Sequence, residues 1–304
     1  MDTKLHETPP AVVILGGSGF VGGHLVTALL DRGCRVAIVS RTPQGQHPIQ
    51  AGVQWLPFKP DHFSELFKGY CALVNLIGIL NEPTHNGRTF EQVHVDLVMQ
   101  ALDAARQAGI GRYLHMSALG ADEHKGTSYY QRSKGRAENR VHAYGREHGI
   151  QVTSFRPSVI FGPGDSFLNR FAQLARLMPG FFPLACPDAR FAPVCVTDVA
   201  RVMADALNDP ATYDQHIDLC GPADYSLREI VDYTARTAGH PRTVIGLPDW
   251  AARLQARLLE YAPGKPFTRD NYQSLQVANV CPPGTPRQPT RLEDIAPTYL
   301  GKRA

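Results

Sequence analysis

Tyr130 and Lys134 are the two side chains of this sequence whose types and spacing best suit acid–base chemistry. Residues four apart lie one turn from each other on the same face of a helix. A tyrosine is a weak acid with a pKa of about 10, and a nearby ammonium group stabilises the phenolate and lowers that pKa. The pair could then exchange a proton with a substrate hydroxyl or carbonyl while hydride is transferred. Alone, this spacing most often marks an ordinary surface pair, so its meaning depends on the surrounding elements.

A glycine-rich stretch follows a short apolar run at residues 12–15 and precedes a helix-like segment. Strand, glycine turn and helix in this order form a cradle for a dinucleotide. Gly16 permits the sharp turn, Gly19 lets a pyrophosphate approach the backbone, and Gly22 lets the helix pack closely on the strand. The pyrophosphate would then sit at the helix N-terminus, where free N–H groups and the dipole favour anions. The residues predicted to bind the cofactor here are Gly16, Gly19, Phe20, Val21 and Gly22.

The end of the second predicted strand, residues 35–39, indicates which dinucleotide is bound. Chains that bind NAD usually carry an acidic residue there, which holds the ribose 2′-hydroxyl. This strand is followed by Ser40 and Arg41, with no carboxylate nearby. A guanidinium group can hold the 2′-phosphate of NADP through paired, charge-assisted hydrogen bonds. We therefore expect NADP(H) rather than NAD(H); the alternative is that Arg41 is a solvated loop residue.

The composition is that of an ordinary globular protein, with 43% hydrophobic and 19% charged residues among 304. The formal net charge of +3 is too small to indicate a nucleic-acid partner. The twelve histidines show no spacing typical of metal ligands, so we expect no metal site.

The cysteines and the apolar runs predict the location. Six cysteines are scattered without a Cys-x-x-Cys pair, which favours buried thiols in a reducing compartment over a disulfide scaffold. Residues 1–10 contain no apolar signal core, and no apolar run is long enough to span a bilayer. We expect a cytoplasmic protein, with a peripheral position on the inner face of the membrane as the alternative.

Strands and helices alternate along the first half of the chain. Apolar strands are expected at residues 11–15, 35–39, 53–56, 72–77, 112–116 and 151–155. This alternation predicts an α/β fold of Rossmann type, with a doubly wound parallel sheet. We expect a dinucleotide-binding domain at residues 1–165, with returning segments at about 193–222. A smaller C-terminal lobe for the substrate would comprise residues 166–192 and 223–304.

These elements place the acid–base pair near the cofactor. The helix predicted at residues 128–148, which carries Tyr130 and Lys134, follows the fifth strand. In such sheets the strand ends and the loops just beyond them line the ligand crevice. This position favours a catalytic site over a surface pair, with Lys134 also bonding the nicotinamide ribose. Gly78, after the fourth strand, could allow the cofactor to approach the backbone or could simply form a turn.

An apolar stripe also occurs in the predicted C-terminal lobe. Trp250, Leu254, Leu258 and Tyr261 fall on one face of a helix, away from the neighbouring charged residues. We interpret this face as packed core, because such stripes are ordinary in helices. Docking to a membrane or to a partner is the alternative.

Both motifs together resemble the short-chain dehydrogenase/reductase superfamily, in its extended or atypical branch, over nearly the whole chain. More specifically, the sequence is similar to the family of the nucleotide-binding accessory subunit of respiratory complex I and its bacterial relatives. The segments that carry this similarity are residues 74–78 (VNLIG), 116–121 (MSALGA), 161–171 (FGPGDSFLNRF), 267–271 (FTRDN) and 296–300 (APTYL).

The resemblance implies a bound NADP(H) or NAD(H). The cofactor would be held by the glycine turn, by Arg41 and Lys134, and by the backbone beyond the sixth strand, at Pro157 and Val159. The resemblance also implies that Tyr130 is the catalytic acid or base.

Two positions depart from the pattern of active extended enzymes. Those enzymes usually have a second Ser or Thr just after the serine that ends the fifth strand, where it bonds the substrate oxygen. Here that position is Ala118, which leaves Ser117 as the substitute hydroxyl. His94 stands where many superfamily members have an asparagine of the proton relay. The catalytic tetrad that the resemblance implies is therefore incomplete.

Two functions remain open. The first is an NAD(P)H-dependent oxidoreductase that acts on an unidentified small molecule. The second is a nucleotide-binding factor for respiratory complex I or for a quinone-synthesis complex of the ubiquinone pathway. An NAD(P)-dependent epimerase or dehydratase of a nucleotide sugar is a third reading, which rests on fold analogy alone.

Overall fold

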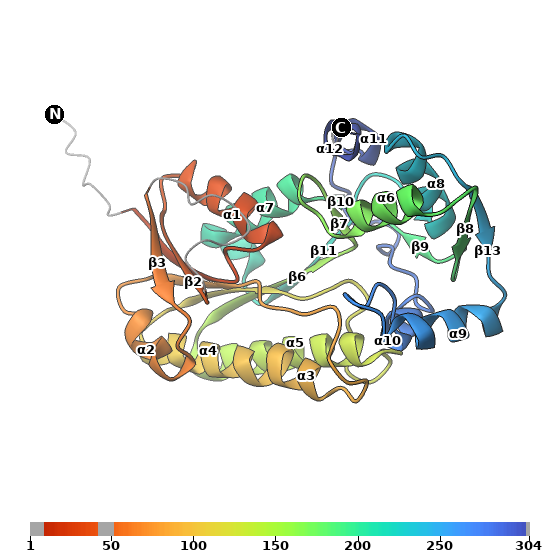
Figure 1. Cartoon of the computed structure of the whole chain (residues 1–304). Coiled ribbons are helices and arrows are strands. Elements are labelled where there is room, and N and C mark those ends of the chain that lie inside the picture. The colour runs from red at the N-terminus through yellow and green to blue at the C-terminus, as the bar shows by residue number, and fades with distance from the viewer. Residues whose placement is uncertain (1–8, 42–51, 302–304) are drawn as a thin grey trace.

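The centre of the molecule is a seven-stranded parallel sheet in the order β11-β6-β5-β4-β1-β2-β3 (Figure 1). The computed structural model describes residues 9–41 and 52–301; residues 1–8, part of the segment without a signal core, lie outside them. The sheet confirms the predicted doubly wound α/β fold. Its strands are β1 (Ala11–Leu15), β2 (Arg35–Ser40), β3 (Val53–Pro57), β4 (Ala72–Asn75), β5 (Arg112–Met116), β6 (Gln151–Pro157) and β11 (Gln215–Leu219).

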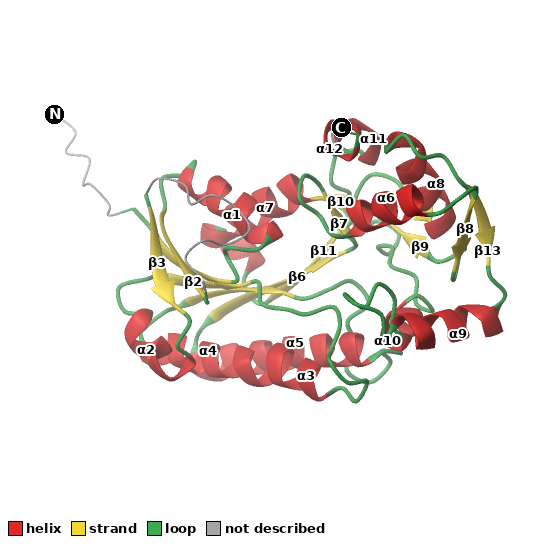
Figure 2. Cartoon of the chain, viewed as in Figure 1, coloured by secondary structure: helices red, strands yellow, loops and turns green. Residues whose placement is uncertain are grey.

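Helices cover both faces of this sheet (Figure 2). Val12 and Ile14 of β1 pack in one core with α1 and α7, whereas Val13 and Leu15 pack in another with α2, α4 and α5. Since successive side chains of a strand point to opposite faces, β1 has to be apolar throughout. The helices are α1 (Phe20–Leu30), α2 (Phe63–Leu66), α3 (Arg88–Glu91), α4 (Leu97–Gln107), α5 (Tyr129–His148) and α7 (Val196–Asp205).

A smaller lobe lies beyond the carboxyl ends of the central strands (Figure 1). It has its own apolar core, in which Phe182 and Leu184 pack with Leu168 and Ile230. Its helices are α6 (Phe167–Leu177), α8 (Leu227–Thr237), α9 (Asp249–Leu259), α10 (Arg269–Ser274), α11 (Leu292–Ile295) and α12 (Pro297–Leu300). Its strands form short pairs, namely β7 (Ile160–Phe161) with β10 (Val194–Cys195), β9 (Arg190–Phe191) with β12 (Tyr225–Ser226), and β8 (Phe181–Leu184) with β13 (Thr243–Gly246).

Two cysteines are paired, contrary to the expectation from their spacing. Cys220 and Cys281 form a disulfide, with Cα atoms 6.0 Å apart. The expectation of free thiols is therefore wrong for this pair. The two cysteines meet because the C-terminal segment of the chain runs back past the end of β11. A hydrogen bond from the Gln288 backbone N–H to the Cys220 carbonyl marks this return. A sequence separation of 61 residues gives no local signal for such a contact.

The apolar stripe on α9 faces outward. Trp250 is 71% exposed and Leu258 is 63% exposed, so the interpretation of this face as packed core is wrong. The residues of α9 that are buried are the small Ala252 and Ala256. Within residues 9–41 and 52–301, no helix is both long and apolar enough to cross a bilayer.

Candidate active site

The turn after β1 has the geometry that its glycine spacing predicts. Gly16 has a φ of +80°, a left-handed conformation that favours glycine. Gly19 is the N-cap of α1, and no side chain among the described residues caps the first turn of this helix. The N–H groups of that turn, which begins with Phe20 and Val21, are therefore left for a ligand. Such a helix N-terminus fits the pyrophosphate of a dinucleotide.

Gly22 is where α1 comes closest to the turn. A Cβ atom at this position would lie 2.4 Å from the carbonyl oxygen of Gly17, which is closer than real Cβ contacts allow. A Cβ atom at Gly16 would lie 3.2 Å from the carbonyl carbon of Leu76, just after β4. The turn is thus confined between its own helix and the neighbouring strand. Any side chain at Gly22 would force the helix away from the turn.

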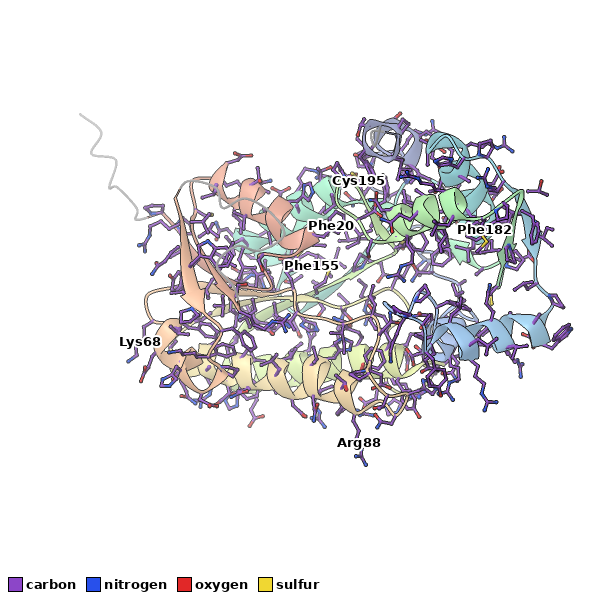
Figure 3. The ribbon with its side chains drawn as sticks, in the orientation of Figure 1. Phe20, Lys68, Arg88, Phe155, Phe182 and Cys195 are labelled. Carbon is purple, nitrogen blue, oxygen red and sulfur yellow. A yellow bond between two sulfur atoms is a disulfide. The ribbon has the colours of Figure 1, made fainter. Side chains whose placement is uncertain are left out.

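The first two residues of α1 differ in their surroundings. Figure 3 labels Phe20 at the end of α1 that faces the C-terminal lobe. Its ring contacts that of His24 edge to face, with centroids 5.8 Å apart. The half-buried side chain of Val21 packs against the core between α1, α7 and the sheet. Both residues can therefore face a ligand with their backbone N–H groups while their side chains fix the helix.

The end of β2 also reaches the glycine turn. The hydroxyl oxygens of Ser40 and Ser18 lie 3.1 Å apart, within hydrogen-bond distance. Arg41 follows directly, with an exposed side chain. The structure thus brings Ser40 and Arg41 to the edge of the cradle, where a dinucleotide would present its adenosine ribose.

Lys134 is buried beneath the ends of β4 and β5. Its side chain is 4% exposed, and Nζ donates a hydrogen bond of 3.0 Å to the carbonyl oxygen of Met116. A Cβ atom at Gly78 would lie 3.1 Å from the same Nζ. Burial lowers the pKa of Lys134 to about 8, although Glu138 acts in the opposite direction. The structure therefore brings Lys134 and Gly78 together, as expected for residues that line one crevice.

Tyr130 is the second residue of the same helix, and its backbone N–H is bonded by a residue of the C-terminal lobe. Ser128 and Gln131 form a capping box at the start of α5. In addition, the buried carboxylate of Asp270 accepts hydrogen bonds from the backbone N–H groups of Tyr129, at 2.7 Å, and Tyr130, at 3.3 Å. Burial, and then the charge of Asp270, raise the pKa of Tyr130 to about 12. The hypothesis that Lys134 lowers this pKa is thus not met in this structure, where burial dominates.

Asp270 is a site residue for which the sequence reasoning assigned no role. It belongs to residues 267–271, which carried the family resemblance. It lies in α10, whose N-cap Thr268 forms a capping box with Asn271. The sequence contained the signal of this short helix, but not the contact of Asp270 with α5.

His94 lies beside this pair on a distorted helix. A π-helical turn (Gln92–Asp96) joins α3 to α4 and carries His94 into the interior. Its Nε2 accepts a hydrogen bond of 3.1 Å from the Ile79 N–H, and its Nδ1 lies 2.8 Å from the Ser133 hydroxyl. Burial and the charge of Lys134 hold its pKa well below the usual value. His94 is therefore neutral and ties the loop after β4 to α5, near Tyr130.

Ser117 is buried next to the ionised Glu138 of α5. The residue is 3% exposed, and its Oγ has no hydrogen-bond partner among the described residues. Burial would raise the pKa of Glu138, but hydrogen bonds from His216 and Arg156 lower it to about 2. Glu138 is thus ionised and is paired with these two side chains. The Ser117 hydroxyl is therefore a buried group that no described residue uses, as a substitute for the missing hydroxyl of Ala118 would need to be.

The backbone beyond β6 is fixed by Asn279. Pro157 accepts a hydrogen bond from the Leu119 N–H. The Val159 N–H donates to Oδ1 of Asn279 at 3.1 Å, and Nδ2 of Asn279 donates to the Leu119 carbonyl at 3.0 Å. Asn279 therefore joins the predicted cofactor-binding backbone to the loop after β5. This contact also has no local signal in the sequence.

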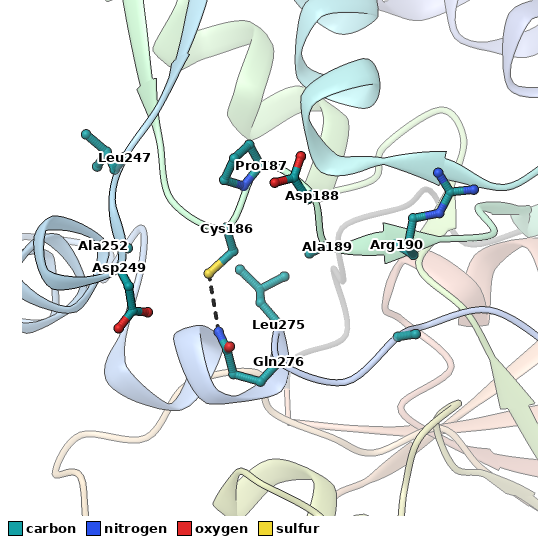
Figure 4. Close-up of a pocket in the computed structure, with 11 residues that line it drawn as sticks. Cys186, Pro187, Asp188, Ala189, Arg190, Leu247, Asp249, Ala252, Leu275 and Gln276 are labelled. Atoms are coloured by element: carbon teal, nitrogen blue, oxygen red, sulfur yellow. Dashed lines mark hydrogen bonds between the residues drawn. The ribbon is translucent and has the colours of Figure 1, made fainter.

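A cavity of about 380 Å³ lies in the C-terminal lobe (Figure 4). Neither Tyr130 nor Lys134 is among its lining residues. It reaches the segment after α10, and α10 is tied to the segment just before α5 by a hydrogen bond from the Thr127 hydroxyl to the Gln273 carbonyl. In the described parts of the chain, no group of three or more His, Cys, Asp or Glu side chains could hold a metal ion. The cavity is lined by Cys186, Pro187, Asp188, Ala189, Arg190, Leu247, Asp249, Ala252, Leu275, Gln276 and Ala278.

Comparison with known proteins places this geometry in context. The model of the NAD dependent epimerase/dehydratase family matches residues 12–220. The mouse (Mus musculus) mitochondrial NADH dehydrogenase (ubiquinone) 1 alpha subcomplex subunit 9 is 28% identical over 298 residues, covering 92% of this chain and 77% of its own. The ceramide reductase of Caulobacter vibrioides is 30% identical over 244 residues, covering 78% of this chain and 74% of its own. The UDP-glucose 4-epimerase of Thermus thermophilus, solved with NAD, shares the fold with a TM-score of 0.63 and 19% identity, over 88% of this chain and 99% of that chain.

Proposed function

The chain belongs to the NAD dependent epimerase/dehydratase family, and from that premise we propose that it is an oxidoreductase that prefers NADP(H) to NAD(H). The family and the fold account for a nicotinamide dinucleotide in the cradle after β1. The preference for NADP(H) is the finer part of the proposal, and it rests on Arg41 and on the lack of a carboxylate after β2.

Different residues of this chain would bind different parts of the cofactor. The uncapped N–H groups of α1 would donate hydrogen bonds to the pyrophosphate, and Arg41 would pair with the 2′-phosphate. Lys134 would donate from Nζ to the nicotinamide ribose, and Tyr130 would exchange a proton with the substrate oxygen. The bound nicotinamide supplies the hydride.

The observation that carries the proposal is the burial of Lys134. A buried ammonium group is costly, because it loses its hydration, and its only hydrogen bond in the described residues is to the Met116 carbonyl. Gly78 leaves space directly above Nζ, which any side chain would fill. A buried lysine with a lowered pKa beside an open glycine is typical of a functional position rather than of a stabilising one.

The substrate that we propose is a carbonyl compound with an apolar portion, such as a lipid ketone or a quinone. The names of two relatives support this choice, one a ceramide reductase and the other a subunit of NADH dehydrogenase (ubiquinone). We also propose a location on the cytoplasmic face of a membrane. The Cys220–Cys281 disulfide would then be an exception among cytoplasmic thiols, most of which are reduced.

A second candidate is a nucleotide-binding factor of a respiratory or quinone-synthesis complex, without turnover of its own. Two observations favour it. Ala118 has no hydroxyl, so the tetrad that the family resemblance implies lacks one of its usual side chains. The pKa of Tyr130, at about 12, is also high for a proton donor or acceptor at neutral pH.

One set of assays on the purified full chain separates these candidates. Binding of NADPH and NADH is measured by calorimetry, and oxidation of NADPH is followed with a short-chain quinone, a long-chain ketone and a UDP-sugar. Turnover that Tyr130→Phe abolishes without weakening NADPH binding supports the oxidoreductase. Tyr129→Phe, the adjacent tyrosine on α5, is the matched control and should keep full activity.

The other outcomes decide against the first proposal. Binding of NADPH without any turnover supports the nucleotide-binding factor. Conversion of the UDP-sugar alone supports an epimerase or dehydratase. Failure to bind either dinucleotide overturns both proposals.

A further inference from the structure

Large apolar side chains are exposed almost entirely on the C-terminal lobe. Of the eight such residues in the described chain, only Leu80 lies outside residues 166–192 and 223–301. A soluble monomer rarely gathers so many exposed apolar residues in one region without a partner. We name as the docking face the residues Leu177, Phe181, Ile245, Trp250, Leu254, Leu258 and Tyr261, which are 48% to 80% exposed.

The helix α9 is oriented with its small residues inward. Ala252 and Ala256 are buried, whereas Trp250, Leu254 and Leu258 follow one another at intervals of four on the outer side. Residues at this spacing form a continuous stripe along a helix. The helix therefore rests on the lobe through alanines and presents its large side chains to the surroundings.

The β8–β13 pair also presents apolar side chains outward. Ile245 of β13 is paired in register with Pro183 of β8, and the Pro183 carbonyl accepts a hydrogen bond from Nε2 of Gln255 in α9. Since side chains alternate along a strand, Phe181 and Ile245 point outward while Phe182 is buried. In Figure 1, α9, β8 and β13 lie together at the end of the molecule away from β3. The docking face thus comprises exposed apolar side chains of a helix and of a strand pair that lie at the same end of the molecule.

The charges at the margin of this surface are mostly positive. Arg253 and Arg257 are exposed on α9, and Arg176 directly precedes Leu177. Among nearby acids, Asp249 forms an ion pair with Arg253 at 2.8 Å, and Glu260 is buried. Asp249 thus neutralises Arg253, whereas Arg257 and Arg176 form no ion pair with any described residue.

We propose that the docking face binds the surface of a bilayer that contains anionic lipids. An amphipathic helix with exposed leucines and flanking arginines lies in the interface, with its apolar side in the acyl boundary and its cations at the headgroups. Trp250 and Tyr261 at the two ends of the stripe are residue types that favour this boundary. This proposal stands on the surface alone and does not depend on hydride chemistry.

Docking would also place the cavity of the lobe close to the bilayer. Asp249 and Ala252 of α9 line that cavity from the inner side of the helix, and Leu247 lines it just before the helix begins. Trp250 and Leu254, from the same turns, would lie in the lipid. An apolar substrate leaving the bilayer at α9 would therefore find the cavity on the other side of one helix.

The test is co-sedimentation of the full chain with vesicles of phosphatidylcholine alone or of phosphatidylcholine mixed with phosphatidylserine. We expect binding to the mixed vesicles that weakens with salt. One unpaired arginine near an anionic surface contributes about fivefold to binding, so Arg176→Gln with Arg257→Gln should weaken it by about 25-fold. Leu254→Ser with Leu258→Ser should abolish it, whereas Leu80→Ser, at an exposed leucine outside the docking face, should not change it.

A second readout reports on the docking face itself. The chain has two tryptophans, so Trp55→Phe leaves Trp250 as the only one. Its fluorescence should shift to the blue when mixed vesicles are added, and thermal unfolding of each variant verifies the fold. Three results would overturn the proposal: no vesicle binding, equal binding to neutral vesicles, or a stable dimer in ultracentrifugation that already shields Trp250.

Discussion

The two helices that form the candidate site begin in opposite ways. At the start of α1, Gly19 is the N-cap and no described side chain bonds the first N–H groups. At the start of α5, Ser128 accepts a hydrogen bond from Gln131, and Asp270 accepts from Tyr129 and Tyr130. Unbonded N–H groups at a helix start have to find another acceptor. The first N–H groups of α1 are therefore available to a ligand. Those of α5 already donate to Asp270 of the C-terminal lobe.

This difference separates binding from proton transfer. The start of α1 has no acidic residue in its first turn and favours an anion. The start of α5 carries the charge of Asp270, which raises the pKa of Tyr130. We therefore expect variants at the glycine turn to abolish dinucleotide binding, and variants near Tyr130 to change the chemistry with little effect on binding.

The largest effect on NADPH binding is expected from Gly22→Ala, which displaces the helix α1. The new Cβ atom would meet the backbone of Gly17 at 2.4 Å, and backbone cannot move aside cheaply. Overpacking of this kind costs about 1–3 kcal/mol, and it displaces α1 from the turn. Since each 1.4 kcal/mol is tenfold, we expect the affinity for NADPH to fall by about 5- to 150-fold, because the N–H groups no longer point at the pyrophosphate. Calorimetry and thermal unfolding with and without NADPH measure both effects.

Gly111→Ala is the matched control for this substitution. A Cβ atom at Gly111 would meet no atom of the described residues within 4 Å, and the residue precedes β5 at the other end of the sheet. Its affinity for NADPH should equal that of the unmodified protein. If Gly22→Ala binds NADPH normally, α1 does not hold the pyrophosphate.

The next largest effect is expected from Lys134→Met. Lys134 lies on α5, but in the proposal it binds the dinucleotide that α1 also holds. A hydrogen bond to a charged group contributes about 1.5–3 kcal/mol, so loss of the Nζ donor should weaken NADPH binding about 30-fold. The pKa of Lys134 is about 8, and the ammonium form is the donor. Affinity of the unmodified protein should therefore decline as pH rises above about 8, and that of Lys134→Met should not. Lys125→Met, at an exposed lysine before the same helix, should retain the pH dependence.

Stability provides an independent check on the same lysine. Its pKa is lower in the folded chain than the usual 10.5, so the unfolded chain binds more protons between these values. Stability without ligand should then rise as pH increases from about 8 to about 10.5. A free energy of unfolding that stays flat over this window, after correction with the Lys134→Met variant, would contradict the burial argument.

Sequence reasoning reached the site where its contacts are local. The glycine turn and the helix of Tyr130 and Lys134 are read from residues within one or two turns of each other, and both elements form as predicted. Three contacts escaped it, namely Asp270 with Tyr130, Asn279 with Val159, and Cys220 with Cys281. Each joins the C-terminal segment either to the helix α5 or to a strand end of the sheet, and no spacing along the chain encodes such a contact.

The interpretation of the α9 stripe as packed core was wrong for a different reason. A period of four residues predicts that Trp250, Leu254 and Leu258 share a face, and they do. It does not say whether that face turns inward. The small size of Ala252 and Ala256 was the available signal, because alanines allow the closest approach of a helix to a core.

A moderate effect is expected from Arg41→Ala, which addresses cofactor choice within the first region. The side chain is exposed, so its bond to a 2′-phosphate is partly screened and should be worth about 1.4 kcal/mol. We expect the dissociation constant for NADPH to rise about tenfold and that for NADH to stay unchanged. Arg35→Ala, at an exposed arginine at the opposite end of β2, is the control. An equal loss for both cofactors would show that Arg41 does not select the phosphate.

The smallest effect on stability is expected from Asp270→Asn, which makes the second helix more like the first by removing its charge. The amide oxygen can still accept from the Tyr129 N–H, so α5 keeps a cap, whereas Asp270→Ala should cost about 1 kcal/mol. Burial raises the pKa of Asp270 itself, so its ionised form is held at a cost. Loss of that cost offsets the lost attraction to the helix dipole, which is about 0.3–1 kcal/mol. The melting temperature should therefore change little.

The chemistry should respond more clearly than the stability. Because the carboxylate of Asp270 raises the pKa of Tyr130, the Asn variant should titrate this tyrosine at lower pH. Ultraviolet titration, with Tyr130→Phe to identify the signal, measures the shift, and any pH–rate profile should move its alkaline limb in the same direction. Asp188→Asn, at an exposed acid of the same lobe, should leave the titration unchanged. An unshifted Tyr130 in Asp270→Asn would mean that burial alone sets its pKa, and the contrast between the two helix starts would then be structural rather than electrostatic.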